Sequence, residues 1–199
     1  MIGIGVRVAD NNDDDTALDA REEDGMKSLV DHLAQYAAYH RDRRNIASHF
    51  IGIPLIVIAV AVLLSRPGIE AAGLWLSPAA AVALAATLFY LRLDLRYGVV
   101  MAILLLLALW LGAIFAQAST AAWLGLGLGG FVVGWIIQFV GHYYEGRKPA
   151  FFDDLVGLII GPLFVVAEAS FMLGMRAEVR RQVEERAGPT CIRVRQPAA

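Results

Sequence analysis

Histidines are the side chains in this sequence best suited to bind a metal ion. There are four of them, His32, His40, His49 and His142, and Glu145 follows the last by three residues. Positions i and i+3 are neighbours on one helix face, a spacing that suits two ligands of one ion. Imidazole and carboxylate ligands without thiolate favour iron, zinc or manganese. A belt of polar and aromatic side chains at a membrane surface is the other explanation for the motif around Glu145, and the motif alone leaves both open.

The spacing of His40 and His49 requires a bend in the chain. The two residues are nine positions apart, which on one straight helix is about 13.5 Å of rise and half a turn. They can bind the same ion only if the chain turns between them, and the polar residues 41–45 are where we expect the turn. Taken alone, His49 is equally well explained as a polar residue at a helix end. His32 is expected at the surface or in a supporting role.

Composition and motifs exclude several other kinds of chemistry. The single cysteine, Cys191, cannot form an internal disulfide or a cysteine-rich metal site. No P-loop, dinucleotide-binding fingerprint or serine-nucleophile elbow occurs in a suitable context, and the glycine-rich residues 125–130 lie inside an apolar segment. A net charge of −2 provides no basic field for nucleic acid.

The composition is that of an integral membrane protein. Hydrophobic residues make up 58% of the chain and charged residues 18%. Uncharged runs of about 20 residues are long enough to cross ~30 Å of hydrocarbon, and they predict an all-α membrane bundle with four transmembrane helices. The apolar runs are Phe50–Leu64, Ala71–Leu91, Tyr97–Ala116 and Ala121–Gly141. The first run is short, so it can span only if Asn45 and His49 belong to the same helix.

Polar segments flank the membrane-embedded part of the chain. Residues 1–25 are acidic and predict a disordered tail, and residues 176–199 are expected to form a basic C-terminal tail. The catalytic domain is expected between them, at 26–175. It begins with an amphipathic helix, Met26–Asp42, because apolar residues recur there at three- and four-residue spacing.

The last apolar stretch, Leu155–Met175, has two possible paths. A turn at residues 161–162, a Gly-Pro pair, makes it a re-entrant helix, whereas an uninterrupted helix is a fifth crossing. The re-entrant path is preferred because it keeps the basic tail on the side of the other basic loops. Glu168 lies inside this stretch, where a carboxylate is costly unless it faces a polar cavity or a partner. We therefore expect Glu168 to support the site.

Basic residues predict the orientation of the bundle. If the first four runs cross, one side holds nearly all of the basic loop residues and the other side only Arg66, so the first side is cytoplasmic. All four histidines fall on that side, and a metal site is expected at the cytoplasmic face. The basic residues on this side are Arg41, Arg43, Arg44, Arg92, Arg96, Arg147 and Lys148.

Two motifs make the sequence similar to a known family. Residues 39–56, YHRDRRNIASHFIGIPLI, and residues 138–168, QFVGHYYEGRKPAFFDDLVGLIIGPLFVVAE, resemble the small membrane proteins typified by the fungal 2-hydroxy fatty acid dioxygenase of long-chain-base degradation. The shared pattern is Tyr-His, an Asn and a second His before the first span, then Gln-Phe-x-Gly-His with a Glu and Pro-Ala after the fourth. The resemblance covers roughly residues 27–175.

The resemblance implies an Fe(II)-dependent dioxygenase that needs no 2-oxoglutarate. Such an enzyme converts a 2-hydroxy fatty acid and O₂ to the fatty acid that is one carbon shorter. His40, His49 and His142 match the motif histidines and Glu145 matches the acid that follows. The resemblance therefore implies that these four residues are the metal ligands and the catalytic residues.

Other residues are expected to assist this chemistry. Arg44 and Arg147 are candidates to attract the substrate carboxylate, and His32, Asn45 and Glu168 are candidates to support the ligands from outside. The acyl chain is expected among the apolar spans, in contact with membrane lipids. The membrane is the plasma membrane in a bacterium, or the endoplasmic reticulum in a eukaryote.

Two alternatives from other classes stay open. One is a different histidine-metal membrane lipid enzyme of the hydroxylase type, although such enzymes use larger HxxxH and HxxHH clusters than four scattered histidines provide. The other is a non-enzymatic membrane scaffold or transporter. A transporter needs polar residues near the middle of the bilayer, and apart from Glu168 the spans contain few.

Overall fold

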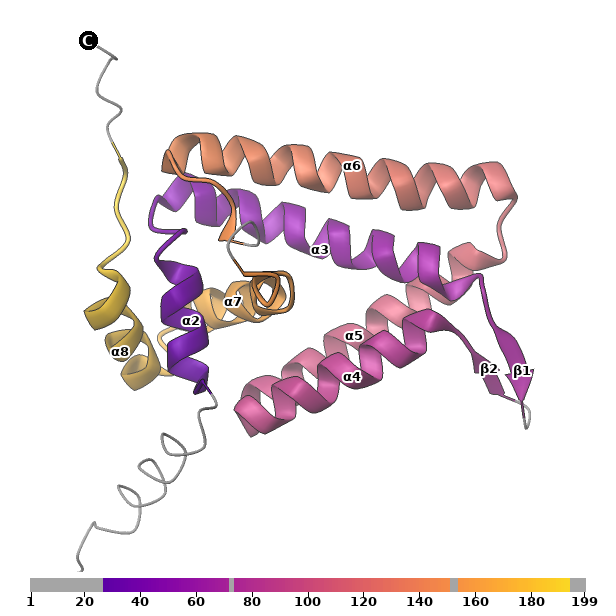
Figure 1. The fold of residues 1–199 in the computed structure, drawn as a ribbon, viewed down its shortest axis with the longest axis horizontal. Helices are drawn as coiled ribbons and strands as arrows, with labels where there is room; N and C mark the ends of the chain where they lie inside the picture. Colours follow the sequence, from indigo (N-terminus) through magenta and orange to yellow (C-terminus); the bar gives the residue numbers. More distant parts are fainter. Residues whose placement is uncertain (1–26, 72–73, 151–153, 194–199) are drawn as a thin grey trace, which may run out of the picture.

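Seven helices and one short hairpin make up the part of the chain that the computed structural model describes, residues 27–71, 74–150 and 154–193 (Figure 1). Three of these helices are long and apolar enough to cross a membrane, and a bent pair of helices is a further candidate. The expected all-α membrane bundle is confirmed. The acidic tail expected at 1–25 lies outside the described residues.

Helix α2, Leu29–Ala37, is shorter than the amphipathic helix expected at Met26–Asp42. It starts after Ser28, whose side chain accepts a hydrogen bond from the backbone N–H of Asp31, while the Asp31 side chain bonds back to Ser28. This reciprocal capping box satisfies N–H groups that a helix start leaves unpaired. The chain then turns over residues 38–42, slightly earlier than the expected turn at 41–45.

Helix α3, Arg43–Ser65, contains both Asn45 and His49, as a full crossing required. Asp42 caps it, because its side chain accepts from the backbone N–H of Arg44. Its 23 residues give about 34 Å of helix, enough to cross the hydrocarbon core. Pro54 lies inside the helix without ending it.

Helix α6, Thr120–Glu145, lies antiparallel to α3 along most of its length (Figure 1). Glycines at seven-residue spacing, Gly127, Gly134 and Gly141, face α3, and a Cβ on Gly134 would lie 2.6 Å from Ile56 Cγ1 and 3.0 Å from the Gly52 carbonyl oxygen. Small residues thus allow the two backbones to approach closely. Because the helices are antiparallel, the start of α3 and the end of α6 meet at one end of the bundle.

The expected helix across Ala71–Leu91 is wrong at its start. Strands β1, Ile69–Ala71, and β2, Leu74–Leu76, form an antiparallel hairpin, and helix α4 begins only at Pro78 and runs to Leu93. Proline at the first helical position disfavours helical backbone in the residue before it, so the helix cannot extend further back. The 16 residues of α4 give about 24 Å, short of a ~30 Å crossing. Helix α5, Leu95–Ala116, returns beside α4.

The expected turn at residues 161–162 is also wrong. Helix α7, Gly157–Met172, continues through this Gly-Pro pair, and the chain bends by 116° only afterwards, before helix α8, Ala177–Ala187. The bend contains Gly174 and Arg176, both with positive φ. Gly174 adopts this backbone at little cost because it has no Cβ. Helix α7 packs against α2, α3 and α5, and α8 packs against α2.

The chain after α8 runs beside the turn between α2 and α3. Residues 188–193, which we name the C-terminal strap, pair with this turn through the backbone of Cys191. The Cys191 N–H donates to the Arg41 carbonyl oxygen at 2.8 Å, and the Arg43 N–H donates to the Cys191 carbonyl oxygen at 2.9 Å. The Arg193 N–H bonds the side chain of Asp42 at 2.8 Å. The strap and α8 therefore give structure to much of the segment expected as a basic tail.

Candidate metal centre

Three of the four histidines meet in the interior of the bundle. His40 comes from the turn between α2 and α3, His49 from the first part of α3 and His142 from the end of α6. Their exposed fractions are 0%, 2% and 5%, and their candidate ligand nitrogens all lie within 4.8 Å of one another. The chain does turn between His40 and His49, so their ring centroids come within 4.4 Å.

Packing fixes the His40 ring. Tyr36, in the last turn of α2, stacks on it with ring centroids 4.1 Å apart and an interplanar angle of 6°. Phe164 of α7 lies 5.6 Å from the same ring. The break after α2 and the docking of α7 are thus what hold His40 against the other two histidines.

Backbone carbonyl groups fix which ring nitrogen is free. His40 Nδ1 lies 2.7 Å from the Tyr36 carbonyl oxygen and His49 Nδ1 lies 2.8 Å from the Asn45 carbonyl oxygen. A carbonyl can only accept, so Nδ1 carries the proton in both rings and Nε2 carries the lone pair. Such a bond to a carbonyl is the usual support of a metal-binding histidine.

Two ring nitrogens of the cluster are buried without a hydrogen-bond partner among the described residues, His40 Nε2 and His142 Nδ1. A buried polar atom left in this way needs an explanation such as an ion. Burial lowers the pKa of His40 well below its usual value, and the neighbouring His49 and His142 lower it further. The His40 ring is therefore neutral at physiological pH, the form that binds metal.

The donor set fits a first-row transition metal. Two nitrogens bound at about 2.1 Å to one ion lie at most about 4.2 Å apart, so small ring rotations bring nitrogens that lie within 4.8 Å onto a common ion. Three neutral imidazoles suit iron, zinc or manganese and leave coordination positions for other ligands.

The structure does not bring Glu145 into this group. Its carboxylate accepts hydrogen bonds from the Asp42 backbone N–H at 2.8 Å and from Asn45 Nδ2 at 3.1 Å. Arg193 Nε of the strap lies 3.0 Å from its other oxygen. With 2% of its surface exposed, Glu145 joins the end of α6 to the turn that carries His40. Asn45 likewise supports the site through its amide and its carbonyl group.

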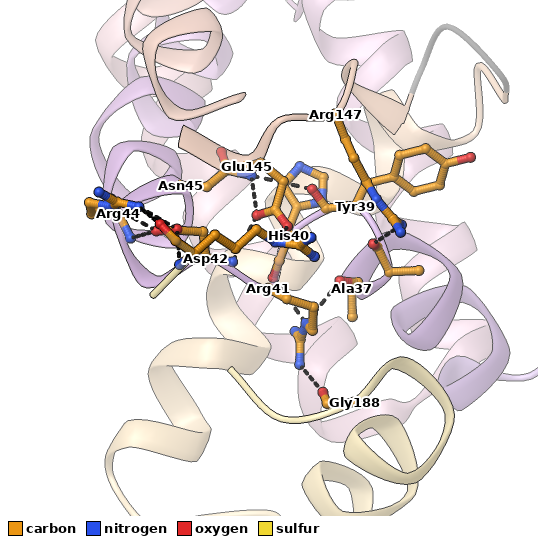
Figure 2. A network of polar contacts seen from close by, with 12 residues as sticks. Ala37, Tyr39, His40, Arg41, Asp42, Arg44, Asn45, Glu145, Arg147 and Gly188 are labelled. Carbon is orange, nitrogen blue, oxygen red and sulfur yellow. Dashed lines mark hydrogen bonds and ion pairs between the residues drawn. The ribbon is translucent and has the colours of Figure 1, made fainter. Parts of the chain in front are cut away.

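The two arginines expected to bind the substrate carboxylate are engaged elsewhere. The Arg44 guanidinium bonds both carboxylate oxygens of Asp42, at 3.0 and 2.7 Å, and these bonds lower the pKa of Asp42 to about 2. Arg147 Nη1 donates to the Ala38 carbonyl oxygen at 2.8 Å (Figure 2). Both residues thus brace the turn between α2 and α3.

Glu168 and His32 lie outside the cluster. The Glu168 carboxylate is 3.3 Å from Arg41 Nη2, and both residues are buried, which gives Glu168 the charged partner that its burial requires. Arg41 also donates to the carbonyl oxygens of Ala37 and Gly188. His32 packs edge-on against Phe89 at 5.9 Å.

A small cavity of about 70 Å³ adjoins the cluster and is lined in part by His49, His142 and Gln138. Gln138 was not predicted to be a site residue. It is 3% exposed, and neither its Oε1 nor its Nε2 has a hydrogen-bond partner among the described residues. Its position could have indicated such a role. Gln138 is a polar residue in an apolar span, and it lies on the same helix face as His142 because it is four residues earlier.

Comparison with known proteins supplies an independent result. The sequence model of a family described as "2-hydroxy-palmitic acid dioxygenase Mpo1-like" matches residues 26–173. The chain is 34% identical over 163 residues to the 2-hydroxy-palmitic acid dioxygenase MPO1 of Saccharomyces cerevisiae, which covers 81% of this chain and 90% of that protein. No solved structure matches the chain.

Proposed function

The chain belongs to the Mpo1-like family, and we propose that it is an Fe(II)-dependent dioxygenase that shortens 2-hydroxy fatty acids by one carbon. The observation that carries this proposal is the buried cluster of His40, His49 and His142, with its unpartnered ring nitrogens. In this proposal His40 Nε2, His49 Nε2 and His142 Nδ1 hold the iron, and the bound iron supplies the chemistry of O₂.

The proposed reaction balances without a further reductant. A 2-hydroxy fatty acid and O₂ give the acid one carbon shorter, CO₂ and water. The bond between the carboxyl carbon and the hydroxyl-bearing carbon breaks, and the two carbons together lose four electrons. One O₂ takes up four electrons, so neither 2-oxoglutarate nor another co-substrate is required.

The surrounding residues support such a site in three ways. Tyr36 and Phe164 cover the His40 ring and exclude water from one side. The carbonyl groups of Tyr36 and Asn45 hold two rings in the tautomer that leaves Nε2 free. Glu145, bonded to the His40 turn, fixes the relative position of α3 and α6. A preorganised site of this kind loses little energy to reorganisation during the reaction.

The site lies at the end of the bundle where the basic loops gather. The turn between α4 and α5, with Arg92 and Arg96, is at the same end as α2 and the end of α6 (Figure 1). Positive residues concentrate on cytoplasmic loops, so we infer that the metal site faces the cytoplasm, in the plasma membrane of a bacterium or the endoplasmic reticulum of a eukaryote.

The alternative of a hydroxylase-type enzyme has less support. Only three of the four histidines come together, and among the described residues no other group of histidine, cysteine and acidic side chains is placed to hold a metal. A scaffold or transporter gives no reason for buried imidazole nitrogens without partners.

The test is turnover by the purified protein loaded with Fe(II) under anaerobic conditions. Oxygen is then admitted, and the products of 2-hydroxy-, 3-hydroxy- and unsubstituted palmitic acid are followed by mass spectrometry. We expect pentadecanoic acid from the 2-hydroxy acid alone, because only this substrate carries its hydroxyl on the carbon whose bond to the carboxyl carbon breaks. Equal consumption of all three acids, or chain shortening that persists after iron is chelated, contradicts the proposal.

A further inference from the structure

An apolar cavity of about 440 Å³ lies between α3, α4, α5 and α6. All of its lining side chains are apolar, among them Val60, Ala83, Leu109 and Phe131. Its volume is in the range of small-molecule binding sites, roughly 300–1,000 Å³. An apolar space of this size in a membrane protein suits a hydrocarbon chain.

This cavity lies beside the smaller one at the histidines. Four residues, Ile56, Val57, Trp135 and Leu158, line both spaces. These four residues come from α3, α6 and α7, and each of them contacts both spaces. A molecule with its polar head at the histidines would place its hydrocarbon tail in the neighbouring apolar space.

The two spaces together are longer than one lipid tail. From His49 to Leu64, which lines the far part of the larger cavity, α3 rises by about 22 Å. A ~30 Å hydrocarbon core holds two tails end to end, so a single tail is about 15 Å long. The path along α3 is thus long enough for a long-chain acid.

We propose that the cavity lined by Ala83, Leu109 and Phe131 is the acyl-chain site, with the substrate carboxylate at the histidines and its methyl end toward Leu64. This inference rests on the proposed function and adds the determinant of chain length. The competing occupant is the tail of a bilayer lipid, and the test separates the two.

The first measurement is photolabelling with a 2-hydroxy fatty acid that carries a diazirine at its methyl end. The full chain in lipid nanodiscs is irradiated, and the labelled peptides are identified by mass spectrometry. We expect label on the segments of α3, α4 and α5 that line the cavity, and loss of label when 2-hydroxypalmitate is added. Labelling that stays on lipid-exposed residues, or that a phospholipid displaces as well as the acid does, overturns the assignment.

The second measurement uses a matched pair of variants on α4. Ala83→Trp places a bulky side chain in the cavity, whereas Ala85→Trp makes the same change at an exposed position of the same helix that does not line it. We expect Ala83→Trp to lower the ratio of kcat/KM for 2-hydroxypalmitate over 2-hydroxyoctanoate by roughly tenfold or more, because several buried methylenes lose their contacts. Ala85→Trp is expected to leave the ratio unchanged, and equal ratios in both variants refute the inference.

Failure of the cavity and failure of the reaction are distinguishable. If the protein does not shorten hydroxy acids but the cavity is still labelled in competition with them, the acyl site stands and the reaction falls. If chain shortening occurs while the label lies elsewhere, the reaction stands and the acyl site falls.

A second inference comes from an independent observation, the unpartnered amide of Gln138. This side chain is almost fully buried, lines the small cavity beside His49 and His142, and makes no hydrogen bond within the described residues. Gly52 of α3 makes room for it, since a Cβ there would lie 3.0 Å from Gln138 Nε2. A primary amide offers both donors and an acceptor, which match a carboxylate and a hydroxyl.

We infer that Gln138 binds the polar head of the substrate, with Nε2 donating to the carboxylate and Oε1 accepting from the 2-hydroxyl. This role also rests on the proposed function. Because the amide makes no hydrogen bond within the described residues, Gln138→Leu is expected to keep or raise the melting temperature. A structural role for Gln138 predicts a lower one.

The test compares Gln138→Leu with Gln117→Leu, an exposed position after α5. We expect the Gln138 variant to weaken competition by 2-hydroxypalmitate against the photolabel by roughly tenfold, the value of a hydrogen bond to a charged group. Iron content should change little, whereas the affinity for unsubstituted palmitate should fall as well, because its carboxylate loses the same donor. A lower melting temperature with unchanged competition assigns Gln138 to the fold and refutes the inference.

Discussion

Replacing Glu145 distinguishes two roles that its position allows. One is a metal ligand, and the other is a brace, meaning a residue that joins the end of α6 to the turn between α2 and α3. Its carboxylate lies three residues beyond His142 in sequence, yet it accepts hydrogen bonds from Asp42 and Asn45 and pairs with Arg193. The brace role predicts that Glu145→Gln retains iron, because glutamine keeps one oxygen that both donors can reach. The ligand role predicts that the same change removes iron.

The cost of losing the brace follows from its contacts. Each hydrogen bond to the carboxylate, from the Asp42 N–H and from Asn45 Nδ2, contributes about 1.5–3 kcal/mol. The pair with Arg193, whose side chain is 36% exposed, adds no more than about 0.5 kcal/mol after solvent screening. We therefore expect Glu145→Ala to lower the free energy of unfolding by about 3–6 kcal/mol, and Glu145→Gln by about 1–2 kcal/mol.

Stability and iron content are measured on the same preparations. Unfolding in detergent is followed by circular dichroism, and iron by elemental analysis after reconstitution with excess Fe(II). Glu178→Gln on α8, an exposed position, is the control for removing one carboxylate and should match the wild type in both measurements.

The combination of results decides between the roles. Near-normal iron in Glu145→Gln with a modest loss of stability supports the brace. Loss of iron in Glu145→Gln at unchanged stability refutes it and makes Glu145 a ligand.

Three further predictions concern the elements around the site. Cys191→Pro removes the N–H that bonds the Arg41 carbonyl and should weaken iron binding about fivefold, whereas Cys191→Ala should leave iron binding unchanged. Equal Fe(II) titration curves for the two variants contradict a role for the strap. Gly134→Val should lower the free energy of unfolding by about 1–3 kcal/mol through overpacking against α3. Gly129→Val, with open space around it, should be nearly neutral. A Gly129 variant that is less stable to heat than the Gly134 variant contradicts the packing of α6 on α3. In intact cells, with Cys191 replaced by serine, a cysteine at Gln117 should react with an impermeant thiol reagent and a cysteine at Lys148 should not. Similar labelling of the two positions contradicts the orientation of the bundle in the membrane.

The sequence predicts well what depends on length and apolar content. Helices α3, α5 and α6 are close to their expected runs, because a span needs a fixed length of uncharged chain. Even the inclusion of Asn45 and His49 in α3 follows from that requirement, and the turn between His40 and His49 follows from helix geometry.

Features that depend on tertiary contacts were not predictable in this way. The Gly-Pro pair at 161–162 reads as a turn, yet α7 continues through it, packed against α2, α3 and α5. The hairpin before α4 interrupts an apolar run whose composition alone does not distinguish strand from helix. Glu145 has the spacing of a ligand, but donors from α3 and the strap, distant in sequence, take its carboxylate.

The iron content of the histidine variants is the most direct test of the metal site. The protein is purified anaerobically, reconstituted with Fe(II), desalted and analysed for iron and protein, together with His40→Ala, His49→Ala, His142→Ala and the control His32→Ala. We expect a single iron ion per chain in the wild type and in His32→Ala, and loss of iron from each of the other three variants with the protein still in the membrane. Full iron in all three variants, or no iron in the folded wild type, contradicts a metal site at these histidines.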